Sequence, residues 1–136
     1  MSDIERTLSI IKPDAVERNL FEKISDILKK NNLKIEKNKK LQISKEEAAE
    51  FYKEHQSKPF YERLCNYLSS GPIVVMELSG ENAISKYRDI MGATDPKKAE
   101  NNTIRQLYGI SIDKNSVHGS DSKSSAKREL EFFFNN

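Results

Sequence analysis

The chain of 136 residues contains little cysteine, histidine and glycine, and each scarcity excludes a class of site. Its single cysteine, Cys65, cannot form an internal disulfide, so a reducing compartment is expected. One cysteine and two histidines supply too few ligands for a zinc site built from these residue types. The five glycines form neither a P-loop nor a dinucleotide-binding fingerprint, so any nucleotide chemistry must use another way of holding phosphates.

Long apolar runs and a strong net charge are also missing. The longest apolar run, residues 73–76, is far shorter than the roughly 20 residues that a membrane span needs. Residues 1–6 lack the basic-then-apolar pattern of a secretion signal, so we expect a cytoplasmic protein with no membrane partner. The net charge of +2 argues against a function driven by one large basic or acidic surface.

The pattern of apolar residues predicts one domain, 1–136, of alternating strands and helices. Strands are expected over 8–11, 33–43 and 73–78, with a last short strand at 117–118. Helices are expected over 24–28, 45–52, 60–68, 83–91 and 122–133, with a short one near 103–107 inside the long connection 92–115. Residues 44–47 (SKEE) form a capping box that should begin the second of these helices at Lys45, and Pro59 should break it. This order predicts an α+β fold: a ferredoxin-like split βαβ unit, with a four-stranded antiparallel sheet flanked by helices.

The most reactive side chain is His118, at the end of the last predicted strand. Gly119 leaves the imidazole uncovered, and the helix start that follows favours anions. A neutral imidazole is a competent nucleophile or base. Glu129 falls on the inward face of that helix, where a carboxylate needs a partner, so we expect it to orient His118. The alternatives are a surface or capping histidine and a surface Glu129 paired with a basic residue.

Arginine is scarce beside lysine, with 6 arginines against 17 lysines, so each arginine is a candidate for planar, bidentate recognition of phosphate. The best candidates for binding phosphate are Arg88, late in the helix before 92–94, and Arg105, in the long connection that precedes His118. Lys12 ends the first strand as a point charge, and Phe60 begins a helix where its ring could hold a base. The other four arginines, Arg6, Arg18, Arg63 and Arg128, are interpreted as members of ordinary surface ion pairs, which is also the alternative for Arg88 and Arg105. Core packing is the alternative for Phe60, and His55 is interpreted as structural.

Six ordered motifs resemble the nucleoside diphosphate kinase family, from about residue 5 to residue 134. The most specific is HGSDS at 118–122. The motifs are 11–15 (IKPDA), 51–52 (FY) with His55, 59–60 (PF), 70–72 (SGP), 91–94 (MGAT) and 115–122 (NSVHGSDS).

The resemblance implies an enzyme that moves the γ-phosphoryl of a nucleoside triphosphate, typically ATP, to a nucleoside diphosphate. The mechanism would be ping-pong, through a phosphohistidine on the pros nitrogen of His118, with Lys12 among the catalytic residues and Ser120 and Glu129 supporting the histidine. Residues implied to bind phosphates and sugar hydroxyls are Lys12, Tyr52, Arg88, Thr94, Arg105 and Asn115. Those implied to hold the base are Phe60, Leu64 and Ile112. Mg²⁺ is the implied cofactor, held mainly by the nucleotide's phosphates with no protein metal site.

Four positions depart from the family pattern: Glu22, Asp95, Leu107 and, conservatively, Ile112. None removes a phosphate or histidine contact. The family resemblance and the apolar content of only 36% predict a homo-oligomer, a tetramer or a hexamer.

The alternative function is a nucleotide- or RNA-binding ferredoxin-like module without turnover. The lysine-rich stretch 23–40 is the feature that suggests it. Acidic residues interrupt that stretch, however, and the aromatic-rich strand motif of RNA binders is absent, so no specific nucleic-acid partner is expected.

Overall fold

A four-stranded antiparallel sheet organises the computed structural model, which describes residues 4–134. The strands are β1 (Ile4–Ile11), β2 (Lys34–Leu41), β3 (Ile73–Glu81) and β4 (Val117–Gly119). The helices are α1 (Pro13–Glu17), α2 (Phe21–Lys30), α3 (Lys45–Phe51), α4 (Tyr61–Leu68), α5 (Ala83–Met91), α6 (Ile104–Tyr108) and α7 (Lys123–Phe134). Short 3₁₀ turns lie at Lys53–His55 and Pro96–Lys98.

The strand order is β2-β3-β1-β4, and every neighbouring pair is antiparallel. The two central strands are β1 and β3, which are separated in sequence by two helices, β2 and two further helices, as in a split βαβ unit. The predicted α+β, ferredoxin-like fold is therefore confirmed. Strand β3 is buried from Ile73 through Ser79, as expected for a central strand covered on both faces.

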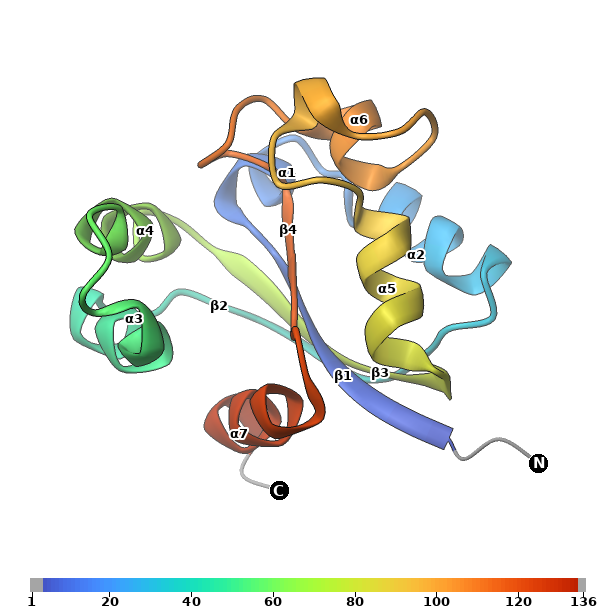
Figure 1. Ribbon diagram of the computed structural model, residues 1–136, viewed down its shortest axis with the longest axis horizontal. Coiled ribbons are helices and arrows are strands. Elements are labelled where there is room, and N and C mark those ends of the chain that lie inside the picture. The colour runs from blue at the N-terminus through green and yellow to red at the C-terminus, as the bar shows by residue number, and fades with distance from the viewer. Residues whose placement is uncertain (1–3, 135–136) are drawn as a thin grey trace.

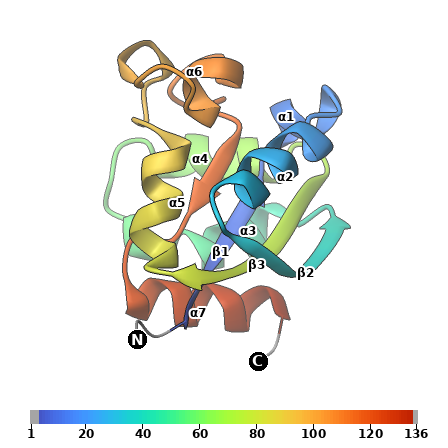
Figure 2. The ribbon, with the colours of Figure 1, turned by 90° about the vertical axis from the view of Figure 1, so that its right-hand side faces the viewer.

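Two apolar clusters form the core, one on each face of the sheet. Side chains of β3 alternate between them: Val74 and Met76 pack in the cluster with α2 and α5, whereas Ile73 and Val75 pack in the cluster with α3, α4 and α7. Figures 1 and 2 show the same division, with α2 and α5 on one side of the strands and α3, α4 and α7 on the other.

The local signals in the sequence correspond to real boundaries. The predicted capping box begins α3 at Lys45: the Glu47 amide donates to Ser44 Oγ at 3.0 Å, and the Ser44 amide donates to Glu47 Oε1 at 2.9 Å. The helix ends at Phe51 and gives way to a 3₁₀ turn, earlier than the break expected at Pro59.

Three of the residues that depart from the family pattern lie on the surface, away from the pocket described below. Glu22 is exposed in the first turn of α2. Asp95 Oδ1 accepts from the Lys97 amide at 3.0 Å and caps a 3₁₀ turn. Leu107 is exposed on α6. Among residues 4–134, no helix is long and apolar enough to cross a membrane.

Candidate functional site

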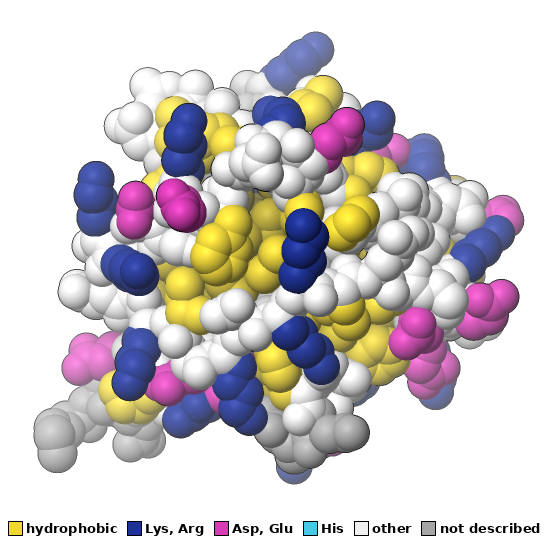
Figure 3. All heavy atoms as spheres, turned by 180° about the vertical axis from the view of Figure 1, so that it is seen from behind, with side chains coloured by type: hydrophobic (Ala, Val, Ile, Leu, Met, Phe, Trp, Pro, Cys, Tyr) yellow, Lys and Arg dark blue, Asp and Glu magenta, His cyan; other side chains and the backbone are white. Residues whose placement is uncertain are grey.

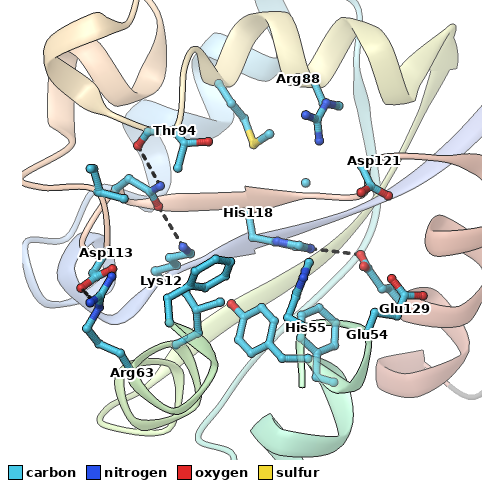
Figure 4. A pocket seen from close by; sticks show the side chains of 18 of the residues that line it. Lys12, Glu54, His55, Arg63, Arg88, Thr94, Asp113, His118, Asp121 and Glu129 are labelled. Carbon is cyan, nitrogen blue, oxygen red and sulfur yellow. Dashed lines mark hydrogen bonds and ion pairs between the residues drawn. The ribbon is translucent and has the colours of Figure 1, made fainter. Parts of the chain in front are cut away.

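A cleft of about 370 Å³ opens where β4, the α3–α4 segment, α5 and the connection before β4 meet. It brings together every predicted site residue except Ser120, which lies beneath it and bonds to Glu129. The predicted residues that line it are Lys12, Tyr52, Phe60, Leu64, Arg88, Thr94, Arg105, Ile112, Asn115, His118 and Glu129. Figure 4 shows His118 in the middle of the pocket, with Lys12 and Thr94 toward one end.

The position of His118 depends on close packing of β4. His118 pairs with Ile10 across the β1–β4 ladder, so the sheet backbone holds its Cα. A Cβ on the next residue, Gly119, would lie 2.7 Å from a ring carbon of Tyr87 on α5. Only glycine therefore allows β4 to approach α5 this closely, and the imidazole is left half-buried with its ring at the cleft surface.

His118 is held by a buried carboxylate. Its Nε2 lies 3.0 Å from Glu129 Oε1, and Ser120 Oγ donates to the same oxygen at 2.8 Å. Burial alone would raise the pKa of Glu129, but the bonds and charges of His118, Ser120 and Arg128 outweigh it and hold this pKa below its usual value. An ionised Glu129 accepts a hydrogen bond from the Nε2–H of His118. This favours the tautomer that keeps its proton on Nε2 and has a free lone pair on Nδ1.

Lys12 reaches the cleft at the end of β1. Its amide donates to the Ser116 carbonyl at 2.8 Å, and its Nζ donates to Asn115 Oδ1 at 2.8 Å. The Asn115 amide group in turn donates to the Thr94 carbonyl at 3.1 Å. Burial lowers the pKa of Lys12 to about 8, and the neighbouring Arg105 charge adds to this effect. Because the acceptor seen for the buried Lys12 ammonium within residues 4–134 is the neutral Asn115 side chain, this ammonium is well suited to bind an anion.

Two arginines complete the cationic side of the cleft. Arg105 is buried, and it donates to the carbonyls of Gly92 at 3.0 Å and Val117 at 2.9 Å. Its Nε is buried with no hydrogen-bond partner among residues 4–134. Burial lowers the pKa of Arg105, yet a guanidinium remains charged. Arg88 is exposed on α5 and lines the same cleft.

The opposite wall is apolar and aromatic. Phe60 and Leu64 at the start of α4 line it, and Ile112 faces them from the loop before β4 with 53% of its surface exposed. The ring of His55 lies 6.1 Å from that of Tyr52 and 6.1 Å from that of Phe60, centroid to centroid. Such a slot suits a flat heterocycle, which it would hold by stacking and apolar contact.

Sequence reasoning missed several pocket residues. His55 was expected to be structural, but it lines the cleft between Tyr52 and Phe60, and its place within the aromatic motif was the available signal. Arg63 was expected in an ordinary surface pair, and its Nε does lie 2.6 Å from Asp113 Oδ2. This pair joins α4 to the loop at the cleft mouth.

Other missed residues lie on the His118 side of the cleft: Glu54, Asp121 and Arg128. A hydrogen bond from Ser125 is the main cause that lowers the pKa of Asp121 and keeps this carboxylate ionised. Within the described residues, no group of three or more His, Cys, Asp or Glu side chains is arranged to hold a metal ion.

The fold and the cleft together define an α+β protein of the phosphotransferase class, with an oriented histidine facing fixed cations. The profile of the family described as nucleoside diphosphate kinase matches residues 5–136. The chain belongs to the nucleoside diphosphate kinase family, and it is a phosphotransferase.

Individual relatives agree with this assignment. The chain is 54% identical over 131 residues to the nucleoside diphosphate kinase of Nitratiruptor sp., with 96% of both chains covered. It is 53% identical to that of Haemophilus ducreyi, with 96% of this chain and 95% of the relative covered.

Solved structures of the family superpose closely. The Aquifex aeolicus enzyme has a TM-score of 0.94 at 41% identity, covering 97% of this chain and 96% of the other. The Halobacterium salinarum enzyme, solved in complex with CDP, has a TM-score of 0.94 at 38% identity, covering 98% and 90%. The resemblance stated from the motifs is confirmed, and a binding module without turnover is not favoured.

Proposed function

We propose that this chain, acting as one domain, carries out the kinase reaction of its family through a phosphohistidine on Nδ1 of His118. The observation that carries the proposal is the bond between His118 Nε2 and the ionised Glu129, which leaves the other ring nitrogen as the nucleophile. The complex of the Halobacterium salinarum relative with CDP supports a nucleoside diphosphate as one substrate.

The transfer has two halves that use one nucleotide site. The Nδ1 lone pair of His118 attacks the γ-phosphorus of a nucleoside triphosphate, the bond to the β–γ bridging oxygen breaks, and a nucleoside diphosphate leaves. A second nucleoside diphosphate then binds, and its terminal phosphate oxygen attacks the phosphorus. The N–P bond breaks and the histidine is restored. A loose phosphoryl transition state requires mainly positioning and positive charge, which Lys12, Arg88 and Arg105 supply.

Each wall of the cleft has a role in this proposal. The phosphates and sugar hydroxyls lie against the polar group of Lys12, Tyr52, Arg88, Thr94, Arg105 and Asn115. The base lies between Phe60, Leu64 and Ile112, and His55 adds a donor at the phosphate end of that wall. Because stacking and apolar contacts do not read base edges, the site accepts purines and pyrimidines alike.

We include Mg²⁺ as the cofactor, bound mainly through the nucleotide's phosphate oxygens. Asp121 fits this assignment, because it is an exposed, ionised carboxylate on the cleft wall and Mg²⁺ prefers such oxygen donors, directly or through water. The bound ion would neutralise charge on the phosphate oxygens during transfer.

The proposal is tested by mixing the protein with γ-labelled ATP and Mg²⁺ without an acceptor. We expect one acid-labile, base-stable label per chain, discharged with similar efficiency by GDP, CDP and UDP. A protein that hydrolyses or transfers phosphate without ever carrying label would contradict the two-step route. Discharge by a single diphosphate alone would contradict the account of the base site.

For Glu129→Gln we expect turnover to fall about 10–100-fold, as when the partner of a ligating or reacting imidazole is removed. The amide fits the same space but can donate to Nε2 as well as accept from it, so the reactive tautomer is no longer favoured. Nucleotide KM should change little, since Glu129 lies behind the histidine. Steady-state kinetics give both numbers, and a raised KM at normal kcat would refute the assigned role.

We also propose a cytoplasmic homo-oligomer, a tetramer or a hexamer. Figure 3 shows hydrophobic side chains gathered in the middle of one face, with basic and acidic side chains around them. Strand β2 is an edge of the sheet, and Leu107, Ile110 and Ile112 are exposed. Light scattering that gave a mass of 15.6 kDa would contradict the oligomer.

The cytoplasmic location is supported by Cys65, the one cysteine of the chain, which is a buried free thiol and fits a reducing compartment.

A further inference from the structure

Arg128 of α7 joins three groups that belong to different parts of the site. Its Nη1 donates to the Phe51 carbonyl at 3.3 Å, at the end of α3. Its Nε lies 3.3 Å from Glu54 Oε1, in the 3₁₀ turn that follows. Its Nη2 lies 3.7 Å from Glu129 Oε2. One half-buried guanidinium therefore contacts both the carboxylate behind the histidine and the segment that carries the nucleotide-binding aromatics.

The two oxygens of Glu129 have different partners. Oε1 is shared by His118 and Ser120, whereas Oε2 faces Arg128. A carboxylate rotates about its last bond, so a cation at Oε2 keeps Oε1 in line with the imidazole. The same cation keeps the carboxylate ionised, because it lowers the pKa of Glu129 along with the larger contributions of His118 and Ser120.

The contacts with the α3 end act on the other side of the imidazole. The Phe51 ring lies edge-on to the His118 ring, with centroids 5.3 Å apart and planes at 73°. Tyr52 follows Phe51 directly in the chain, His55 lies three residues further on, and both line the cleft. Through its hydrogen bond to the Phe51 carbonyl and its ion pair with Glu54, which lacks hydrogen-bond geometry, Arg128 sets how closely this segment approaches the nucleophile.

We propose that Arg128 is a positioning residue for phosphoryl transfer, which couples the nucleotide-binding segment 51–55 to the orientation of His118. The proposal rests on the phosphohistidine route and deepens it, since Arg128 acts through Glu129 and Phe51 and not on the phosphates. A planar guanidinium spreads its charge over three nitrogens, so it can donate to the Phe51 carbonyl and lie within 4 Å of both carboxylates at once, which a compact ammonium cannot.

The groups around Glu129 determine the sign of the pH effect. His118 and Ser120 face it from β4 and the turn after it, and Tyr52 faces it from the end of α3. Arg128 faces it from its own helix, and it is itself partly neutralised by Glu54. Removing Arg128 takes away a positive charge that lowers the pKa of Glu129, so the acid limb set by the ionisation of Glu129 moves to higher pH.

The test compares Arg128→Met, Arg128→Lys and Glu54→Gln with Lys127→Met, an exposed neighbour on the same helix, as the control. For Arg128→Met we expect single-turnover labelling from γ-labelled ATP to slow about fivefold, as for loss of one partly exposed ion pair. We also expect the acid limb of kcat/KM to rise by about 0.5 pH unit.

The other variants separate the two contacts. Arg128→Lys should restore the acid limb but not the labelling rate. Glu54→Gln should raise nucleotide KM about threefold, because the nucleotide-binding segment 51–55 loses its ion pair with Arg128. The acid limb should stay in place or move to lower pH, because the charge of Arg128 is then less neutralised. Thermal unfolding of each variant checks folding, and Lys127→Met should match the wild type throughout.

Distinct results overturn the coupling proposal and the phosphohistidine route. A wild-type protein that takes no label defeats the phosphohistidine route itself. Normal labelling of the wild type, with Arg128→Met indistinguishable from Lys127→Met in rate and pH profile, defeats the role of Arg128 alone. If Arg128→Met does not fold, that role is equally defeated when Arg128→Lys takes label as fast as the wild type and Glu54→Gln has the nucleotide KM of the wild type.

Discussion

A His118→Ala variant is expected to take no label from γ-labelled ATP and to lose kinase activity by at least about 10⁴-fold, as when a covalent nucleophile is removed. The other group bonded to Glu129 Oε1 is the Ser120 hydroxyl, which is buried beneath the cleft and does not line it, so it cannot replace the imidazole as the nucleophile. Labelling at a single time point, followed by steady-state turnover, measures both losses.

His55 provides the matched control, because it is the other histidine of the chain and lines the same cleft. A His55→Ala variant should still take one label per chain while binding nucleotide more weakly. Label that persists in His118→Ala, or disappears in a folded His55→Ala, would move the phosphorylated position to another residue. Nucleotide binding by His118→Ala should persist, since the cations and the aromatic wall are intact.

For Lys12→Met we expect opposite effects on activity and stability. Kinase activity should fall about 10²–10³-fold, the usual loss when one preorganised donor to a transition state is removed. The free energy of unfolding at pH 7 should rise by about 1–2 kcal/mol, because burial of this ammonium destabilises the folded chain. The lost hydrogen bond to Asn115 offsets part of that gain.

The same burial predicts a pH dependence. The folded protein releases the Lys12 proton near pH 8, whereas the unfolded chain keeps it up to its usual value of 10.5. Within that window the unfolded state binds more protons, so this group makes the wild type more stable as the pH rises. Nucleotide KM should rise above pH 8 as the charge is lost.

Urea unfolding at pH 7 and pH 10 tests the stability effect, with the exposed Lys114→Met as the control. The difference in stability between Lys12→Met and the wild type should shrink at the higher pH. A Lys12→Met protein less stable than the wild type at pH 7 would show that Lys12 stabilises the fold, contrary to this account.

Most elements could be predicted from the sequence because their signals are local. The capping box at Ser44, the apolar run of β3 and the spacing of Ala126, Leu130 and Phe133 act over a few residues of backbone geometry. The expected helix over 45–52 agrees with α3 to one residue, but the 3₁₀ turn between its end and the break expected at Pro59 has no signal in the sequence. Some predicted site residues lie in the motifs and others, such as Arg88, Arg105 and Glu129, lie outside them; the structure brings all of them except Ser120 to one cleft.

His55, Arg63 and Arg128 were not predicted as pocket residues, and the reason is physical. An arginine in an exposed ion pair and one that joins two parts of a site have the same local sequence pattern. Arg128 meets Phe51 across a sequence separation of 77 residues, so no spacing within either segment predicts the contact. Only the packing of α7 beside α3 decides it.

By itself, the sequence determined the α+β order of elements and the histidine followed by glycine. It also lacks a P-loop pattern and has too few cysteines and histidines for an internal disulfide or a zinc site built from those two residue types. These follow from residue identity and short-range backbone geometry. The tertiary structure decided which ring nitrogen faces Glu129, that Arg105 Nε has no hydrogen-bond partner within the described residues, and how burial lowers the pKa of Lys12. Each of these depends on distances and desolvation, which exist only once the sheet and its helices have packed.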